Sequence, residues 1–215
     1  MKTYIVIGLG RFGKSVAARL YELGNEVLAI DASEENIQQI SNFVTHAVVG
    51  DARDEAVLRA LGVRNYDCAI VSIGGDLSAS ILITLALKEL GVPAVICKAS
   101  NELNKKALEK VGADRVIIPE REMATKLAQS LSSSNLLDFI ELSSDYGIAE
   151  ISVPESWVGK SIRELNVRAK YGVTILSFKQ GGRMTVLPGV DEKIPEGTAV
   201  DVLGTNEQIA KMQKL

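Results

Sequence analysis

The sequence predicts an α/β protein in which a doubly wound parallel sheet is followed by a smaller α+β domain. Short apolar runs alternate with helical patterns through the first 135 residues, and a glycine-rich turn follows the first run. Beyond that point, closely spaced strand patterns are separated by Gly and Pro turns. We therefore assign residues 1–135 to the first domain and residues 136–215 to the second.

Short apolar runs predict the strands of the first domain, with helical patterns between them. Capping residues mark where helices begin: Asp31 or Ser33 precedes one, and Asp54 precedes another. Glycines mark where four helices end, because glycine readily adopts the left-handed conformation that closes a helix. The runs are Tyr4–Ile7, Val27–Ile30, Ala47–Val49, Cys68–Ser72, Ala94–Cys97 and Arg115–Ile118, and the closing glycines are Gly24, Gly62, Gly91 and Gly112.

The first strand runs into Gly8-Leu9-Gly10-Arg11-Phe12-Gly13, and a helical pattern follows. Gly8 permits a tight turn, Gly10 leaves room for phosphate groups, and Gly13 lets the helix lie close to the strand. Free N–H groups and the dipole at the start of that helix favour bound phosphate. The pattern is typical of a Rossmann-like nucleotide site. Within it, Arg11 either neutralises phosphate or pairs with a surface acid.

Asp31 ends the second strand, eighteen positions after Gly13. A carboxylate at that place accepts hydrogen bonds from both ribose hydroxyls but repels a 2′-phosphate. We therefore expect a ligand with a plain ribose. ATP, ADP and NAD(H) all satisfy that condition, so this argument leaves the choice among them open.

Other candidate residues follow the remaining strands, at the edge where parallel strands end together. Asp51 and Ala52 follow the third strand, where a side chain can reach the adenine edge, although Asp51 could instead cap the next helix. Ser72-Ile73-Gly74 follows the fourth strand and either lines the ribose and phosphates or forms an ordinary turn. Lys98 ends the fifth strand and Glu120 follows the sixth, so both lie at the same edge; the alternative is that either side chain is merely solvated.

The helix predicted over Leu77–Leu90 is apolar on nearly every side until Lys88 and Glu89. One side faces the sheet, so we expect the other to meet a second subunit, with burial in a single core as the simpler alternative. A further helical pattern runs from Pro119 to Leu131, as an arm toward a neighbour. The serine cluster at 132–135 is interpreted as a hinge, and helical periodicity resumes over 136–140.

In the second domain, strand patterns alternate with turns and a helix closes the chain. We expect this helix to begin near Glu207. The predicted strands are Ile148–Val153, Val173–Phe178, Met184–Leu187 and Ala199–Leu203.

Composition excludes several classes of function. The 215 residues are 47% hydrophobic with a formal net charge of −3, so there is no basic excess to bind nucleic acid. We find no leader and no apolar run long enough to cross a bilayer, and therefore expect a cytoplasmic protein. Cys68 and Cys97 lie in apolar runs and are interpreted as small hydrophobic residues. His46 has no companion that would make it catalytic or a metal ligand.

Catalysis finds little support in the sequence. A dehydrogenase needs an acid/base opposite its nicotinamide, yet the second domain contains no histidine. Phosphoryl transfer needs a G-x-x-x-x-G-K-[ST] loop or a kinase signature, and neither occurs. We therefore interpret the chain as a nucleotide-binding switch that is not an enzyme, with an NAD-dependent oxidoreductase as the alternative.

Five motifs together are characteristic of one known family. They are Gly8-Leu9-Gly10-Arg11-Phe12-Gly13, Gly50-Asp51-Ala52, Leu90-Gly91-Val92, the run K-V-G-A-D-R-V-I-I-P-E from Lys110 to Glu120, and V-R-A-K-Y-G from Val167 to Gly172. With them the chain resembles the RCK (KTN) proteins, and among these the Ktr-type cytosolic gating subunits of bacterial potassium uptake systems. The resemblance covers essentially the whole chain; the glycine-rich turn is its least specific part, and the longer motifs over 110–120 and 167–172 are more specific.

The resemblance implies an octameric ring of such subunits on the cytoplasmic face of a membrane potassium-translocating subunit. ATP and ADP would compete for the glycine-rich crevice, with ATP favouring the active ring. Asp31 would hold the ribose, Asp51 would approach adenine, and Arg11 would reach phosphate across a dimer contact. Glu120 would help to bind a divalent cation, Mg²⁺ or Ca²⁺, near the terminal phosphate. A Trk-like relative that uses NAD(H) is the intermediate alternative.

The second domain is similar to the RCK carboxy-terminal domain, which implies dimerisation and a site for inhibitory cyclic di-AMP at the dimer interface. Arg168 would supply charge there, and the other residues apolar contact with the bases. Thr174 stands where the resemblance leads us to expect asparagine. A structural ion pair is the alternative role for Arg168. The implied ligand residues are Ile162, Leu165, Val167, Arg168 and Pro188.

Overall fold

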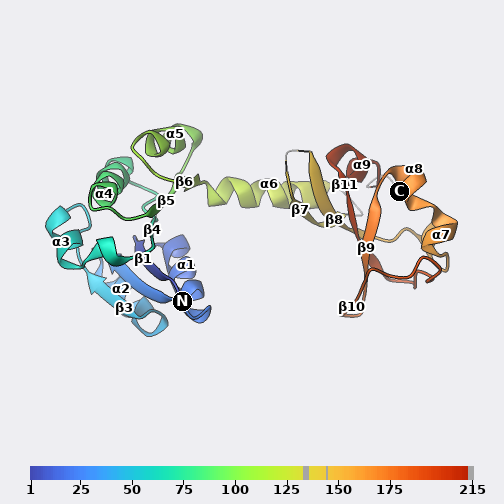
Figure 1. Cartoon of the computed structure of the whole chain (residues 1–215), viewed down its shortest axis with the longest axis horizontal. Helices are drawn as coiled ribbons and strands as arrows, with labels where there is room; N and C mark the ends of the chain where they lie inside the picture. Colours follow the sequence, from blue (N-terminus) through green and yellow to red (C-terminus); the bar gives the residue numbers. More distant parts are fainter. Residues whose placement is uncertain (133–135, 144, 213–215) are drawn as a thin grey trace. The chain divides into compact units, whose positions relative to one another are not determined.

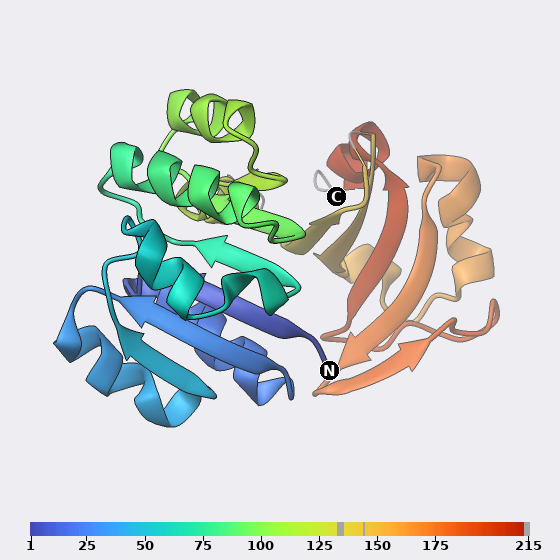
Figure 2. The same cartoon turned by 60° about the vertical axis from the view of Figure 1, so that its left-hand side comes forward.

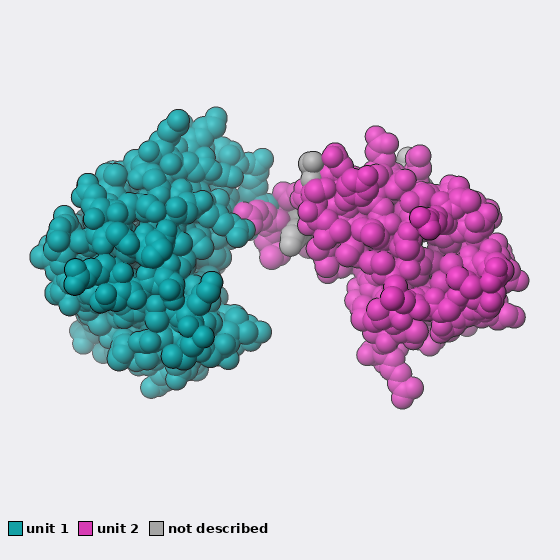
Figure 3. Space-filling model, in the orientation of Figure 1, with its two compact units in different colours: residues 1–121 teal, residues 122–215 magenta. Residues whose placement is uncertain are grey.

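The computed structural model describes residues 1–132, 136–143 and 145–212. The chain divides into two compact units, residues 1–121 and 122–215 (Figure 3). Helix α6 (Pro119–Ser132) is shared between them, so the boundary expected after residue 135 stays a prediction. Most of the serine cluster interpreted as a hinge lies outside the described residues.

Unit 1 contains a six-stranded parallel sheet in the order β3-β2-β1-β4-β5-β6 (Figure 1). All six strands predicted from the sequence are present, which confirms the parallel α/β class. The strands are β1 (Thr3–Ile7), β2 (Glu26–Asp31), β3 (His46–Val49), β4 (Cys68–Val71), β5 (Ala94–Lys98) and β6 (Arg115–Ile117).

Helices cover both faces of this sheet (Figure 2). On one face, Leu58, Ile83 and Leu108 pack with side chains of the strands in one apolar cluster. On the other face, Ala17 and Ile37 belong to a separate cluster. The helices are α1 (Arg11–Glu22) and α2 (Glu34–Ile40) on this second face, and α3 (Glu55–Ala60), α4 (Leu77–Glu89) and α5 (Glu102–Lys110) on the first.

The strand order reverses between β1 and β4. From β1 the chain proceeds outward through β2 and β3, and it then returns to the other side of β1 for β4, β5 and β6. The loops that leave β1 and β4 therefore diverge, which opens a crevice at the carboxyl ends of these strands. The fold thus places the glycine-rich turn where ligands bind in doubly wound sheets.

Unit 2 contains a five-stranded antiparallel sheet in the order β10-β9-β11-β8-β7. One face of the sheet packs into an apolar core with the helices, and Trp157 is 4% exposed within that core. The elements are β7 (Leu136–Glu141), β8 (Tyr146–Ser152), α7 (Ile162–Leu165), α8 (Val167–Tyr171), β9 (Thr174–Gln180), β10 (Arg183–Val186), β11 (Ala199–Thr205) and α9 (Asn206–Met212).

One local prediction for this region is wrong, and two short helices were not predicted. The helical periodicity interpreted over 136–140 is wrong, because these residues form β7 and pair antiparallel with β8. Apolar residues three and four apart indicate a helix in isolation, but pairing with β8 decides the conformation here. The short helices α7 and α8 were not foreseen, and Asn166 joins them with φ 46°.

Two helices carry exposed apolar side chains. On α4, Ile83 and Leu87 are buried, whereas Leu82 is 54% and Leu85 38% exposed. On α6, Met123, Leu127 and Leu131 repeat at four-residue spacing and are all exposed. Within the described part of this chain, α4 is therefore buried on the side that faces the sheet, while Leu82 and Leu85 stay exposed. The contact with a second subunit that the sequence led us to expect would involve these exposed side chains, and it stays a prediction.

Candidate nucleotide site

The glycine-rich turn holds the start of α1 against the ends of β1 and β4. Gly8 has φ 88°, and a Cβ atom there would lie 2.9 Å from Ile73 Cγ1. A Cβ on Gly13 would lie only 2.0 Å from the carbonyl oxygen of Gly8, which no side chain can tolerate. A Cβ on Gly10 would meet no described atom within 4 Å, so this position opens onto the crevice. Gly8 and Gly13 thus have the steric roles that the sequence predicted, and the role of Gly10 in leaving room for phosphate stays a prediction.

Asp31 ties the second strand to the glycine-rich turn. One carboxylate oxygen accepts a hydrogen bond from Leu9 N–H at 2.5 Å. The other accepts one from Ser33 N–H at 2.8 Å and one from Asn36 Nδ2 at 3.3 Å. The cap of α2 is Ser33, whose hydroxyl accepts from Asn36 N–H. Asp31, which is half-buried, is therefore fixed at the lip of the crevice.

A first crevice of about 360 Å³ extends from Asp31 toward α4. That volume lies in the range of small-molecule sites. Its floor is apolar and its rim is polar, which suits a flat base with hydrogen-bonding edges. The floor includes Ile7, Ile30, Ala52, Ile73, Ala79 and Ile83, and the rim carries Asp31, Asp51, Arg53 and Asp76.

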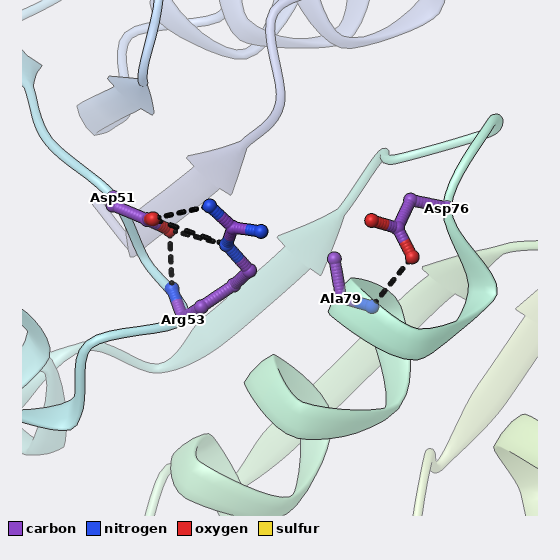
Figure 4. Close-up of polar contacts among 4 residues, drawn as sticks. All are labelled: Asp51, Arg53, Asp76 and Ala79. Carbon is purple, nitrogen blue, oxygen red and sulfur yellow. Dashed lines mark hydrogen bonds and ion pairs between the residues drawn. The ribbon is translucent and has the colours of Figure 1, made fainter.

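Asp51 is held in the rim by Arg53 (Figure 4). Arg53 Nε donates to the two carboxylate oxygens at 2.9 and 3.0 Å, and Nη2 donates at 2.6 Å. Arg53 N–H adds a fourth hydrogen bond at 3.0 Å. The side-chain hydrogen bonds from Arg53, followed by the backbone one, lower the pKa of Asp51 to about 2. Asp51 therefore does not cap the next helix; Asp54 does, by accepting from Ala56 N–H.

A second crevice of about 480 Å³ adjoins the start of α1. Its charged residues are Arg11, Lys98 and Glu120, and Lys98 Nζ donates to Glu120 Oε1 at 2.5 Å. The hydrogen bond from Lys98 lowers the pKa of Glu120, with smaller contributions from its own backbone N–H and from the charges of Lys98 and Arg11. Lys98 Nζ also lies 5.8 Å from the centre of the Phe12 ring. The excess of positive charge suits phosphate groups.

Three residues line both crevices: Gly10, Ser72 and Gly74. Ser72 is 7% exposed, and its hydroxyl has no hydrogen-bond partner among the described residues. The hydroxyl oxygen is buried beside Gly13, 3.2 Å from the position a Cβ atom would take there, so the backbone and the rest of the side chain are what Ser72 presents to the crevices. One extended ligand can therefore pass from the first crevice to the second past Ser72.

The structure brings the residues predicted for the first domain together. All of them line one of the two crevices except Gly13, which supports the turn from beneath. The sequence reasoning missed Arg53 and Asp76. Asp76 had a visible signal, because it directly precedes the apolar run of α4 and caps that helix by accepting from Ala79 N–H at 2.9 Å. The residues placed together are Gly8, Gly10, Arg11, Phe12, Asp31, Asp51, Ala52, Ser72, Ile73, Gly74, Lys98 and Glu120.

The candidate residues of unit 2 divide between core and surface. Leu165 and Val167 are 5% and 2% exposed and pack in the core. Arg168 is exposed, whereas Ile162 and Pro188 are half-buried. The loop that contains Pro188 is tied to α7, because Arg163 N–H donates to the Val190 carbonyl at 2.9 Å. Of the five, only Ile162, Arg168 and Pro188 offer surface to a ligand.

No metal cluster appears in the described part of the chain, where no three His, Cys, Asp or Glu side chains converge. Glu120 would therefore supply one carboxylate to a divalent cation, and other ligands would have to come from phosphate oxygens and water. Cys68 and Cys97 are buried, as predicted, and burial raises the pKa of both thiols. Across the described ranges, no helix combines the length and the apolar character that crossing a bilayer requires.

Comparison with known proteins gives matches over the whole chain. Residues 4–119 match the TrkA-N domain and residues 148–215 the TrkA-C domain. The Ktr system potassium uptake protein A of Bacillus subtilis (strain 168) is 44% identical over 212 residues, which cover 99% of this chain and 96% of the relative.

Solved structures show the same fold. The GsuK channel matches with a TM-score of 0.71 at 20% identity, over 99% of this chain and 38% of that one. The NAD(P)-binding domain of an exopolyphosphatase-related protein from Archaeoglobus fulgidus matches with a TM-score of 0.54 at 26% identity, over 61% of this chain and 98% of that one.

Proposed function

Because this chain belongs to the RCK family, with a TrkA-N and a TrkA-C domain, we propose that it is a cytosolic subunit that gates a membrane potassium transporter in response to ATP and ADP. The similarity to a Ktr system potassium uptake protein over nearly the full length of both chains supports a role in potassium uptake. The subunit acts by binding and not as an enzyme. It works at the inner face of the cell membrane, with a potassium-translocating protein as its partner.

One observation carries the proposal: two joined crevices of opposite charge meet at the start of α1. The first has three carboxylates and one guanidinium in its rim, and the second has two cations and one carboxylate. A nucleotide fits in one direction only, with its base and ribose in the first crevice and its phosphates in the second. In that pose, Asp31 accepts from the ribose hydroxyls and Asp51 faces the adenine edge.

The ion pair in the second crevice explains how ATP and ADP, which differ by one phosphate, can have different effects on the protein. Lys98 pairs with Glu120 in the described structure, so a longer phosphate chain competes with Glu120 for the Lys98 ammonium. A released Glu120 carboxylate suits Mg²⁺ or Ca²⁺, whose remaining ligands would come from phosphate oxygens and water. ATP and ADP would therefore leave different charges at this edge, which is the differential interaction that a ligand-driven switch requires.

The switch acts on an assembly of copies of this chain. Exposed apolar side chains on α4 and α6 supply the contact surfaces for a homo-oligomer, which we propose to be an octameric ring. Unit 2 forms dimers within it and takes up inhibitory cyclic di-AMP. Arg168 meets phosphate there, while Ile162 and Pro188 face the bases. Because Leu165 and Val167 lie in the core, their role is to hold α7 and α8 in place.

A second candidate ligand is NAD(H). The relative from Archaeoglobus fulgidus is a NAD(P)-binding domain, and the fixed Asp31 carboxylate accepts the adenosine ribose of NAD(H) equally well. An NAD-dependent oxidoreductase is the weakest alternative, because the crevices contain no histidine.

Calorimetric titration of the full chain with ATP, ADP, NADH and cyclic di-AMP tests these assignments. Asp31→Asn keeps the shape of the side chain but makes it a weaker hydrogen-bond acceptor for the ribose hydroxyls, so the heat of ATP binding should fall sharply. Asp31→Ala should abolish that heat. Arg168→Ala should leave ATP binding unchanged and abolish cyclic di-AMP binding. If ATP heat survives Asp31→Ala unchanged, the assignment of the crevice is wrong; oxidation of NADH with a metabolite would contradict the absence of catalysis.

A further inference from the structure

Arg53 lies between two carboxylates that belong to opposite walls of the first crevice. Asp51 follows β3, and Asp76 follows β4 at the start of α4. Figure 4 shows the guanidinium group of Arg53 on the side of Asp51 that faces Asp76 and Ala79. The hydrogen bonds to Asp51, then the charge of Asp51 and, more weakly, that of Asp76, raise the pKa of Arg53. Arg53 is therefore the one cation among the four charged residues that line this crevice.

Both carboxylates are held in place. Asp51 accepts its hydrogen bonds from Arg53, and Asp76 is fixed as the cap of α4 through Ala79 N–H at 2.9 Å. Arg53 N–H also donates to Asp51, so the backbone of the loop fixes the pair in addition to the side chain. The guanidinium group is consequently confined to one place on the rim, although the side chain is 55% exposed.

This position leaves the crevice open. The volume of about 360 Å³ is measured with Arg53 in place, so its side chain forms part of a wall and does not fill the space. The same crevice is also lined by the apolar side chains of Ile7, Ala79 and Ile83. A planar base between them would contact aliphatic groups on one face and a guanidinium plane on the other, an arrangement that favours stacking.

Arg53 also determines what Asp51 can recognise. Because two N–H groups of Arg53 already point at Asp51, the carboxylate stays ionised and can only accept hydrogen bonds. An acceptor at this edge suits the amino group at position 6 of adenine. The carbonyl oxygen that guanine has at the same position would face a carboxylate and be repelled.

We propose that Arg53 is the base-positioning residue of this site: its guanidinium group stacks on the purine ring and orients Asp51 so that adenine is selected over guanine. The inference deepens the proposed function and rests on it. It applies equally to ADP, ATP and NADH, because all three carry adenosine. Asp76 contributes by drawing the guanidinium group over the crevice.

Calorimetry of the full chain with ADP, GDP and inorganic pyrophosphate tests the role of Arg53. Arg53→Ala should raise the Kd for ADP roughly tenfold and bring the ratio of the Kd for GDP to the Kd for ADP close to one. The Kd for pyrophosphate should stay unchanged. Arg53→Lys keeps the charge but loses the planar fork, so it should restore part of the affinity and little of the selectivity. Asp76→Asn keeps the cap acceptor without the charge and should raise the Kd for ADP about threefold.

Arg59→Ala is the matched control. Arg59 is an exposed arginine in α3 that pairs with Glu55, so its loss changes net charge equally, away from the crevice. It should change ADP affinity less than about twofold. If Arg53→Ala behaves like Arg59→Ala, or weakens pyrophosphate as much as ADP, Arg53 does not position the base. If the wild-type chain binds no adenine nucleotide at all, the proposed function fails and this inference fails with it.

Discussion

In unit 1, candidate ligand residues from loops after successive strands line two joined crevices, whereas in unit 2 the predicted ligand residues divide between core and surface. All the residues that line these two crevices in the structure come from one chain. The second leaves only Ile162, Arg168 and Pro188 accessible, which is too little to enclose a dinucleotide. We therefore expect a dinucleotide site in unit 2 to need a second copy of the chain.

The difference follows from the two kinds of sheet. Parallel strands all end at one edge, so their loops and the start of α1 converge there. Antiparallel strands place their connections at both ends, and the sheet offers faces instead. In unit 2 one face is covered by the core, while the other has a hollow of about 320 Å³ crossed by the ion pair of Lys179 and Glu150. The parallel unit thus offers two joined crevices within one chain, and the antiparallel unit presents surfaces.

The largest effect is expected at Gly13. Gly13→Ala would place a Cβ atom 2.0 Å from a backbone oxygen, so we expect the free energy of unfolding of unit 1 to fall by about 3 kcal/mol and nucleotide binding to be lost. The single tryptophan, Trp157, reports on unit 2. Circular dichroism should therefore show the loss, while the tryptophan fluorescence transition stays in place.

Gly10→Ala is the control for that prediction. The added methyl group meets no described atom within 4 Å, so stability should stay within about 0.5 kcal/mol while ligand affinity falls. Equal destabilisation by both alanines would show that the close contact of Gly13 does not matter.

The matching change in unit 2 is Gly172→Ala. Gly172 has φ 77°, and a Cβ atom there would lie 2.3 Å from Gln208 Nε2, so we expect a loss of about 2 kcal/mol that shifts the tryptophan fluorescence transition. Gly159 has φ 76° with no described atom within 4 Å of a Cβ, and Gly159→Ala should cost about 1 kcal/mol. Nucleotide binding in unit 1 should survive both. A loss of ADP binding in Gly172→Ala would mean that the two units are not independent.

The smallest effect concerns pH and Asp114 in unit 1. Burial alone would raise the pKa of this carboxyl, but hydrogen bonds from Val95 N–H and Lys88 prevail and lower it. Its contribution to stability is therefore present above the unfolded pKa of about 4 and is lost as pH falls through the lower native value.

Asp114→Asn keeps an acceptor for Val95 N–H and removes the charge. At pH 6 the free energy of unfolding of the wild type should exceed that of this variant by less than about 1 kcal/mol, because half of the Asp114 side chain is exposed. Below about pH 4 the difference should be smaller still. Circular dichroism at the two pH values measures the difference. A difference that is constant with pH would assign the effect to packing.

The sequence predicts most of unit 1 because local signals and tertiary structure agree there. Gly8 and Gly13 form the tight turn and the close helix contact that their spacing indicated, and the strands lie where apolar runs occur. Asp31 lies at the lip of the first crevice, and its contact with ribose stays a prediction. Arg53 was missed because an arginine two residues after Asp51 resembles any solvated side chain until the loop folds back. Its partner Asp76 was visible as a helix cap, and only the fold places it across the crevice.

Unit 2 is less predictable because its local patterns are ambiguous. The apolar spacing in Leu136–Glu141 matches a helix as well as a strand, and hydrogen bonding to β8 settles the conformation. Whether Leu165 and Val167 face a ligand or the core depends on how α7 and α8 pack, which no spacing in the sequence reveals. Expectations based on motifs are weakest where short helices set the direction of each side chain.

Hydrogen–deuterium exchange of the full chain with and without ADP tests most directly the claim that unit 1 holds an adenine nucleotide by itself. We predict slower exchange in the segments 8–13, 50–53 and 72–76, which line the two crevices, and no change in 162–168 or 186–190. Protection confined to unit 2, or no protection at saturating ADP, would contradict the account.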